Sequence, residues 1–208
     1  MQNYTVSQEG GDIVVSFTNV KALTPVRATV LQNFYQANFK WAPYNGYSQT
    51  GWMSELGIAL AAGADWDTAT SYVMNDDYSK VDLTLDGVKV QSKSSTKERD
   101  YENYHPNVVS TQMEKTVEAN DLIVWSFMRN CKTITAPCPN PFDGKPVRIP
   151  ARIDMEAPLE CVIREGAWTD EVDVDSLFLE QTNRTKSYKF TGNTVPAAEL
   201  SIFSGVVR

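Results

Sequence analysis

Three residues whose side chains could bind a cation and a phosphate lie within one short stretch of the chain. Asp82, Gln91 and Lys93 belong to VDLTLDGVKVQSKSS, residues 81–95. They supply a carboxylate, an amide oxygen and an ammonium group. Mg²⁺ prefers hard oxygen ligands of this kind, and an ammonium group can hold a phosphate as a point charge. The plain alternative is a solvated polar face, for which these residue types need no chemical reason.

The stretch has the pattern of a β-hairpin that would bring the three side chains together. Asp86-Gly87 is a favoured pair for the centre of a type I′ turn. With that turn, Asp82 faces Gln91 across the hairpin, and Lys93 shares the face of Gln91 because side chains alternate along a strand. The other predicted pairs are Leu85 with Val88, Thr84 with Lys89, Leu83 with Val90, Val81 with Ser92 and Lys80 with Lys93. One face is therefore apolar and the other carries the candidate residues.

The segments around the hairpin predict an α/β or α+β fold with one central mixed sheet flanked by helices. We expect a single domain over residues 1–208, with the core motif in 50–130 and residues 131–208 completing the sheet and contributing to substrate choice. Strands are predicted at 12–18, 122–128, 147–153 and 159–165, and helices at 24–39, 50–63, 65–75, 110–119 and 174–182. Thr24-Pro25 is expected to begin the first helix and Gly63 to end the second.

Composition limits the classes of function. The net charge of -7 argues against a protein that coats nucleic acid through bulk charge. It leaves room for an enzyme with a local basic groove, and basic residues outnumber acidic ones from Lys89 to Arg99. No apolar run approaches the length of a membrane span, and residues 1–17 lack the basic start and apolar stretch of a signal peptide. We therefore expect a cytoplasmic protein.

Other reactive residue types give weaker signals. The three cysteines, Cys131, Cys138 and Cys161, lack the spacing of a zinc site and are interpreted as reduced structural thiols. The single histidine, His105, lies before a proline in a tyrosine-rich segment and favours a structural or exposed role. Aromatic residues in 38–52 could stack on bases, but packing is the favoured interpretation. Glycine-rich nucleotide loops and serine hydrolase motifs are missing from the sequence.

The order of the candidate residues resembles the core of the PD-(D/E)XK nuclease superfamily, the fold of many restriction endonucleases and Holliday-junction resolvases. Members place an aspartate on one strand and a (Glu/Gln)-x-Lys triplet on the next, a pattern that Asp82 and Gln91-Ser92-Lys93 match. Many also carry a glutamate on the preceding helix, as Glu55 does in WMSELGIALAAG. In its own right, Glu55 could instead be an acid favoured by the dipole in the first turn of a helix.

The resemblance covers roughly residues 50–95, and residues 118–128 are similar to the family's next helix and strand. Two positions depart from the common pattern. Gln91 stands where glutamate is more frequent, which lowers the charge available for a metal. Residues 79–81 lack the proline that often precedes the aspartate.

The resemblance implies a Mg²⁺-dependent deoxyribonuclease, with Mn²⁺ as a substitute ion, and an endonuclease of restriction or resolvase type rather than an exonuclease. It implies that Asp82, Gln91, Glu55 and the main-chain carbonyl of Ser92 hold the metal, and that Lys93 orients or deprotonates the attacking water. Bound Mg²⁺ can supply the nucleophile and neutralise the phosphate. Contacts to the DNA backbone are expected from Ser94, Ser95, Lys97 and Arg99. DNA is the implied partner, and a homodimer that cuts both strands is an alternative to a monomer.

Two further interpretations stay open. The protein could be a catalytically inactive DNA- or protein-binding module that keeps the nuclease-like hairpin, with Gln91 reflecting a lost metal. It could also be an unrelated α+β interaction protein, for which the hairpin pattern is a coincidence and the net charge of -7 is ordinary.

Overall fold

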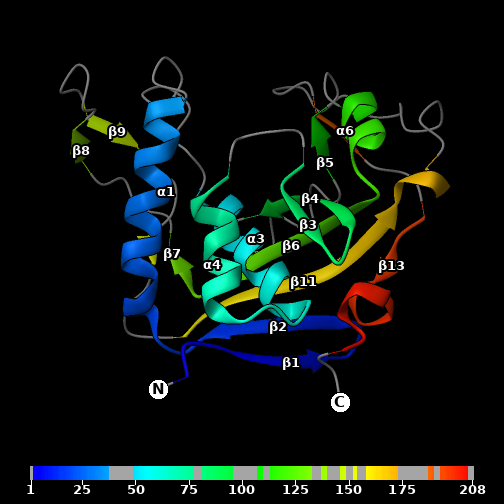
Figure 1. The fold of residues 1–208 in the computed structure, drawn as a ribbon, viewed down its shortest axis with the longest axis horizontal. Coiled ribbons are helices and arrows are strands. Elements are labelled where there is room, and N and C mark those ends of the chain that lie inside the picture. The colour runs from blue at the N-terminus through cyan, green and yellow to red at the C-terminus, as the bar shows by residue number, and fades with distance from the viewer. Residues whose placement is uncertain are drawn as a thin grey trace.

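A mixed β-sheet forms the centre of the protein (Figure 1). A computed structural model describes residues 2–37, 49–76, 81–95, 107–109, 113–132, 137–139, 146–148, 152–153, 158–172, 187–189 and 193–205. Among these residues the main sheet has seven strands in the order β1-β2-β11-β6-β4-β3, with β13 beside β11. Its strands are β1 (Thr5–Glu9), β2 (Asp12–Phe17), β3 (Leu83–Leu85), β4 (Val88–Ser95), β6 (Leu122–Arg129), β11 (Leu159–Trp168) and β13 (Val195–Pro196). β4 and β6 pair in parallel, and the other pairs are antiparallel, so the sheet is mixed as predicted.

Helices lie on both faces of this sheet. The first face is covered by α1 (Leu23–Ala37), α3 (Gln49–Ala61) and α4 (Trp66–Met74), and α6 (Met113–Ala119) joins β4 to β6. Short 3-10 helices are η1 (Val20–Ala22), η3 (Thr169–Glu171), η5 (Ala197–Glu199) and η6 (Ser201–Phe203). Three two-stranded sheets complete the described elements: β5 (Asn107–Val109) with β12 (Ser187–Lys189), β7 (Cys131–Lys132) with β10 (Arg152–Ile153), and β8 (Pro137–Pro139) with β9 (Pro146–Arg148).

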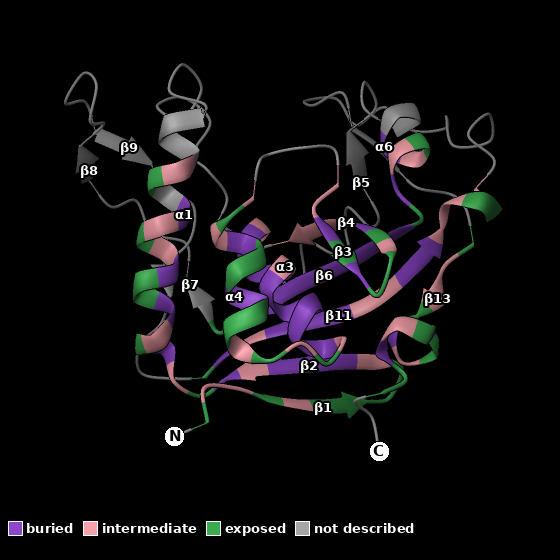
Figure 2. Cartoon of the chain, viewed as in Figure 1, coloured by how far each residue is buried: buried purple, intermediate pink, exposed green. Residues whose placement is uncertain are grey.

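The two faces of the sheet bury separate apolar clusters, because strand side chains alternate between faces. In β6, Leu122, Val124 and Met128 join the cluster beneath α3, whereas Ile123, Trp125 and Phe127 join the cluster on the other side. Val117 of α6 packs against the second cluster. Figure 2 shows the central strands almost wholly buried, which explains why the segment LIVWSFM is a continuous apolar run.

Local signals set the ends of the helices around the hairpin. At the end of α3, Ala64 N–H donates to Ala59 O and Gly63 N–H to Leu60 O, the bonding pattern of a Schellman motif. Gly63 has a φ of 94°, a left-handed value that favours glycine. The next helix follows at once, since the Asp65 carboxylate accepts a 2.7 Å hydrogen bond from Thr68 N–H as the N-cap of α4.

Several sequence predictions need correction. β1 was not predicted, because its residues are mostly exposed and show no apolar alternation. The segment 147–153 contributes to two separate short strands, β9 and β10, and the proline-rich segment before it contains β8. α1 begins at Leu23, so Thr24-Pro25 lies inside its first turn, after η1. The predicted helix at 174–182 lies outside the described residues.

The described cysteine thiol is that of Cys161 in β11, which is free and completely buried. Burial raises its pKa to about 12, which leaves the thiol unreactive at neutral pH. Within the described ranges, no helix is both long and apolar enough to cross a membrane.

Candidate active site

The hairpin that carries the predicted site residues has the predicted register. The observed pairs are Leu83 with Val90, Thr84 with Lys89 and Leu85 with Val88. Asp86 and Gly87 have φ angles of 49° and 86°, positive values that a type I′ turn requires at both central positions. Leu83, Leu85 and Val90 are buried beneath α3. The register prediction is therefore confirmed for the strand residues that pair.

Asp82 directly precedes β3 and is bound to the neighbouring strand by its side chain. Its Oδ2 accepts a hydrogen bond of 2.7 Å from the main-chain N–H of Ser92 and a second from Nε2 of Gln91. Both of these bonds end on Oδ2, and Oδ1 accepts none from the described residues. These two bonds hold the carboxylate against β4.

Gln91 turns toward Asp82 through its nitrogen rather than through the oxygen that the sequence interpretation assigned to a metal. The side chain is only 8% exposed, so its amide needs a partner within the protein. An N–H group next to a carboxylate is favourable without a cation, whereas an amide oxygen there would be repelled. For Oε1 to reach a cation held by Asp82, the amide has to rotate about its last torsion, which is soft.

Lys93 lies on the same face of the sheet as Gln91, the face that points away from α3. In the parallel register Gln91 is next to Ile123 and Lys93 is next to Trp125, and both neighbours belong to the second apolar cluster. Burial lowers the pKa of Lys93, while the negative charges of Asp82 and Glu55 act in the opposite direction. The ammonium group therefore lies close enough to both carboxylates to feel their charge.

Glu55 approaches this cluster from α3. Its carboxylate leans toward the start of the helix, since a Cβ built on Gly51 would lie 4.0 Å from Glu55 Oε1. Burial raises the pKa of Glu55 well above its usual value, Asp82 and then Asp76 raise it further, and Lys93 lowers it. Because α3 includes Gln49, Glu55 lies beyond the first turn, and the helix dipole does not explain it.

Asp82 experiences the same neighbours. Burial raises its pKa, and so does the charge of Asp76, whereas Lys93, the Ser92 N–H and the Gln91 amide lower it. The structure thus brings Glu55, Asp82, Gln91 and Lys93 into one neighbourhood. They come from α3, from the residue before β3 and from β4, and they span 39 residues of sequence from first to last.

Asp76 is a member of this neighbourhood that the sequence analysis missed. It follows Asn75, the C-cap of α4, and its charge acts on both Glu55 and Asp82. A signal was present in the sequence, because an acid at the C-terminal end of a helix is unfavourable with the helix dipole. The helix dipole therefore does not account for Asp76, and a role in the carboxylate cluster would.

The predicted DNA contacts are only partly within the described residues. Ser94 and Ser95 end β4, are half-buried, and lie beside Ser126 and Phe127 of β6. Lys97 and Arg99 lie outside the described residues, as does His105. In the aromatic segment 38–52, Trp52 is completely buried in the core, which supports packing for that residue.

The donors available for a metal are few. In the part of the chain that the structure describes, no three His, Cys, Asp or Glu side chains gather closely enough to hold an ion. A cation bound by Asp82 would therefore depend on Gln91, main-chain oxygen or water in addition to carboxylates. Mg²⁺ tolerates such a set, because it commonly keeps several waters and needs only one or two carboxylates.

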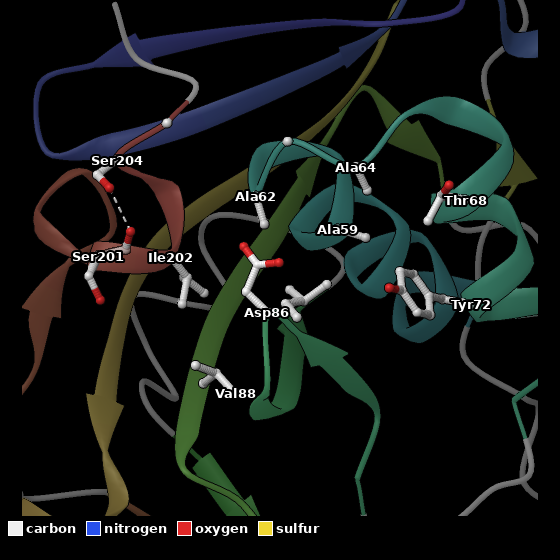
Figure 3. Close-up of a pocket in the computed structure, with 13 residues that line it drawn as sticks. Ala59, Ala62, Ala64, Thr68, Tyr72, Asp86, Val88, Ser201, Ile202 and Ser204 are labelled. Carbon is white, nitrogen blue, oxygen red and sulfur yellow. Dashed lines mark hydrogen bonds between the residues drawn. The ribbon is translucent and has the colours of Figure 1, made fainter.

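A described pocket lies elsewhere, at the C-terminal end of α3 (Figure 3). Its volume is about 560 Å³, and it shares no residue with the carboxylate cluster. The lining residues are Ala59, Ala62, Gly63, Ala64, Thr68, Tyr72, Leu85, Asp86, Val88, Ser201, Ile202, Ser204 and Gly205. Figure 3 shows the Asp86 carboxylate directed toward the alanines of the helix. We regard the cluster as the better candidate site, because several ionisable groups with displaced pKa values converge there.

Comparison with known proteins adds no relative. No family model matches the chain, and neither the curated proteins nor the solved structures include a match.

Proposed function

We propose that the protein is a Mg²⁺-dependent phosphodiester hydrolase that acts on DNA, with Asp82 at the centre of its site. The observation that carries this proposal is the environment of one carboxylate. Asp82 is bonded by the Gln91 side chain and the Ser92 main chain of the adjacent strand. The charges of Glu55 and Lys93 act in the same neighbourhood.

The charge arrangement supports a bound cation. Glu55 and Asp82 are half-buried, and burial raises the pKa of both carboxyls. The charge of Asp76 raises both pKa values further, and the charge of Asp82 raises that of Glu55. The protein thereby opposes the ionisation of groups that a divalent cation would stabilise in their ionised form. A cation in this place would relieve the repulsion between the carboxylates.

Different residues of the cluster would bind the metal ion and position the phosphate or the attacking water. Asp82 Oδ1 and Glu55 would hold the ion, and Gln91 would add Oε1 after its amide rotates. A bound Mg²⁺ would neutralise the phosphate charge and lower the pKa of water. Lys93 would hold the scissile phosphate or orient the attacking water, since its ammonium group lies within electrostatic reach of both carboxylates.

The order of elements supports a restriction-endonuclease-like core. α3 is followed by the β3–β4 hairpin, then by α6, and then by β6 in parallel with β4. This is the order that the resemblance implies for residues 50–128. A homodimer that cuts both strands of DNA belongs to the same proposal.

One observation favours a second candidate, a DNA- or protein-binding module that does not cleave. The Gln91 Nε2 bond to Asp82 Oδ2 pairs the two side chains without a metal ion. A chain that had lost its metal could keep this pair as a structural contact between the two strands.

A cleavage assay separates the two candidates. Supercoiled, linear and branched DNA would be incubated with the protein and Mg²⁺ or Mn²⁺, beside Asp82→Ala and Lys93→Ala. Asp86→Asn is the matched control, because Asp86 lies in the same hairpin at the turn, away from the cluster. We expect cleavage by the unmodified chain and by Asp86→Asn only. The absence of cleavage on every substrate with both metals would favour the binding module, and equal cleavage by all variants would indicate a contaminating enzyme.

A further inference from the structure

Three serine hydroxyls form a polar seam between α3 and the sheet. Ser54 is completely buried, and its Oγ lies 2.7 Å from Ser92 Oγ in β4 and 2.6 Å from Ser126 Oγ in β6. We call these three residues the serine seam. Next to Ser54 in the helix, the apolar residues Trp52, Met53 and Leu56 are all completely buried in the core. The seam is the polar part of an otherwise apolar helix–sheet contact.

Burial alone does not explain the seam. Hydroxyls removed from water must find partners, and here each of them does, so the arrangement avoids a cost rather than adding much stability. Alanines could fill much of the same space without this requirement. A hydrogen bond differs from an apolar contact in its dependence on distance and angle. The seam can therefore fix the position of α3 along and around its own axis.

Two residues of the seam are adjacent to residues of the candidate site, one in β4 and one in α3. Ser92 bonds the helix through its hydroxyl and holds the Asp82 carboxylate through its main-chain N–H, at 2.7 Å. Ser54 directly precedes Glu55 in α3. A single residue of β4 thus contacts both the helix that carries Glu55 and the Asp82 carboxylate, whose charge raises the pKa of Glu55.

We propose that Ser54 is a positioning residue, whose hydrogen bond to Ser92 sets where α3 presents Glu55 relative to Asp82. The inference rests on the proposed metal-dependent function for its consequence, although the contact exists without it. Ser126, which also binds Ser54, is the control position within the serine seam. Its hydroxyl bonds Ser54 from β6 but has no bond to Asp82, so its loss would cost stability without disconnecting Ser92 from the helix.

Mn²⁺ binding tests the inference, measured from the electron paramagnetic resonance signal of free Mn²⁺. The variants are Ser54→Ala, its matched control Ser126→Ala, and Glu55→Gln alone and combined with Ser54→Ala. We expect Ser54→Ala to weaken Mn²⁺ binding about tenfold, as loss of an outer-shell partner of a metal ligand does, and Ser126→Ala to leave the affinity nearly unchanged. In the Glu55→Gln background, Ser54→Ala should have little further effect, because residues that act through one another are not additive.

The contact also has a readout that needs no metal. Carbodiimide coupling of an amine to carboxyl groups, mapped by peptide mass, reports how accessible Glu55 is. Ser54→Ala should speed modification of Glu55, and Ser126→Ala should not. Equal modification in both variants, or additive effects of Ser54→Ala and Glu55→Gln on Mn²⁺ binding, would overturn the positioning role. A chain that binds Mn²⁺ but cuts no DNA would overturn the nuclease instead and leave this inference standing.

Discussion

The middle and the C-terminal end of α3 offer contrasting environments. At the middle of the helix, half-buried Glu55 lies within electrostatic reach of Asp82 and Lys93, and the pKa values of all three groups are displaced. At the C-terminal end, small side chains such as Ala59 and Ala62 border an open pocket of about 560 Å³. The pocket is a defined cavity, but the only carboxylate among its lining residues is that of Asp86, which is exposed.

The difference shows that a hollow and a reactive site are separate properties. A cavity forms wherever side chains are small or point away from it. Displaced pKa values require more, because the fold must hold like charges close together despite their repulsion. Such an arrangement is costly in a folded protein, so it is a stronger indication of function than volume alone. Variants in the carboxylate cluster and beside the pocket can test this contrast.

The largest effect is expected from the two aspartates of one hairpin. Asp82→Asn should abolish the rise in melting temperature that Mn²⁺ causes, and Asp86→Asn should leave that rise intact. If metal binding supports cleavage, the same change at Asp82 should slow it at least about 100-fold, which corresponds to a loss of roughly 2.7 kcal/mol. Thermal unfolding with and without Mn²⁺ measures the first effect. A Mn²⁺ response that survives in Asp82→Asn and disappears in Asp86→Asn would place the metal at the pocket.

The next effect concerns the packing of α3 on the sheet. A Cβ at Gly57 would lie 2.6 Å from Cys161 Sγ and 2.8 Å from its Cβ, so Gly57→Ala should destabilise the protein by about 1–3 kcal/mol through overpacking. Urea unfolding provides the measurement. Gly51→Ala in the same helix is the control, because its nearest neighbour would be Glu55 Oε1 at 4.0 Å, an ordinary contact. It should be neutral or stabilise by up to about 1 kcal/mol. Equal losses in both would contradict the close approach at Gly57.

Gln91→Glu should sharpen the difference between the carboxylate cluster and the pocket. Without metal, a further carboxylate next to Asp82 replaces the amide donor with a repelling group, and we expect a loss of about 1–3 kcal/mol at neutral pH. With Mn²⁺ the new carboxylate becomes a ligand, so the metal-induced rise in melting temperature should exceed that of the unmodified chain. A rise no larger than that of the unmodified chain would show that Gln91 does not face a metal.

The smallest effect is the pH dependence of stability without metal. The pKa of Glu55 is raised, so the folded protein binds its proton more tightly, and stability falls as pH rises from about 4.5 through the folded-state pKa. Glu55→Gln should remove that fall in melting temperature between pH 4 and pH 8.

Asp65, the N-cap of α4, shows the opposite behaviour. The Thr68 N–H lowers its pKa, so its contribution is lost as pH falls. Asp65→Asn should therefore alter only the acidic end of the curve, and a profile unchanged in Glu55→Gln would contradict the burial of that carboxyl.

Local patterns made much of the site neighbourhood predictable. Asp86-Gly87 determines the turn, and the alternation of Leu83, Leu85 and Val90 determines which face packs, so the register follows from adjacent residues. Gly63 and Asp65 mark the boundary between two helices in the same way. These features depend on a few neighbouring residues, and the sequence contains all of them.

Other features depend on contacts between distant segments. The orientation of the Gln91 amide is decided by the Asp82 carboxylate, and the effect of Asp76 on Glu55 is decided by where α4 ends relative to α3. β1 has no apolar alternation, and the sheet partner β2 determines it instead. The serine seam is also of this kind, since Ser54 and Ser126 are ordinary residues until α3 is placed on the sheet.

The place of β11 has a consequence for how the chain is made. β11 joins β2 to β6, so the sheet cannot connect the N-terminal hairpin to the strands next to the site until residues 159–168 have left the ribosome. Closing so long a loop is slow, because its entropy is lost before its contacts form. A nascent chain that ends at residue 130 would hold Glu55, Asp82, Gln91 and Lys93 without the strand that unites the sheet. The complete set of site residues is translated well before the protein can assemble around it.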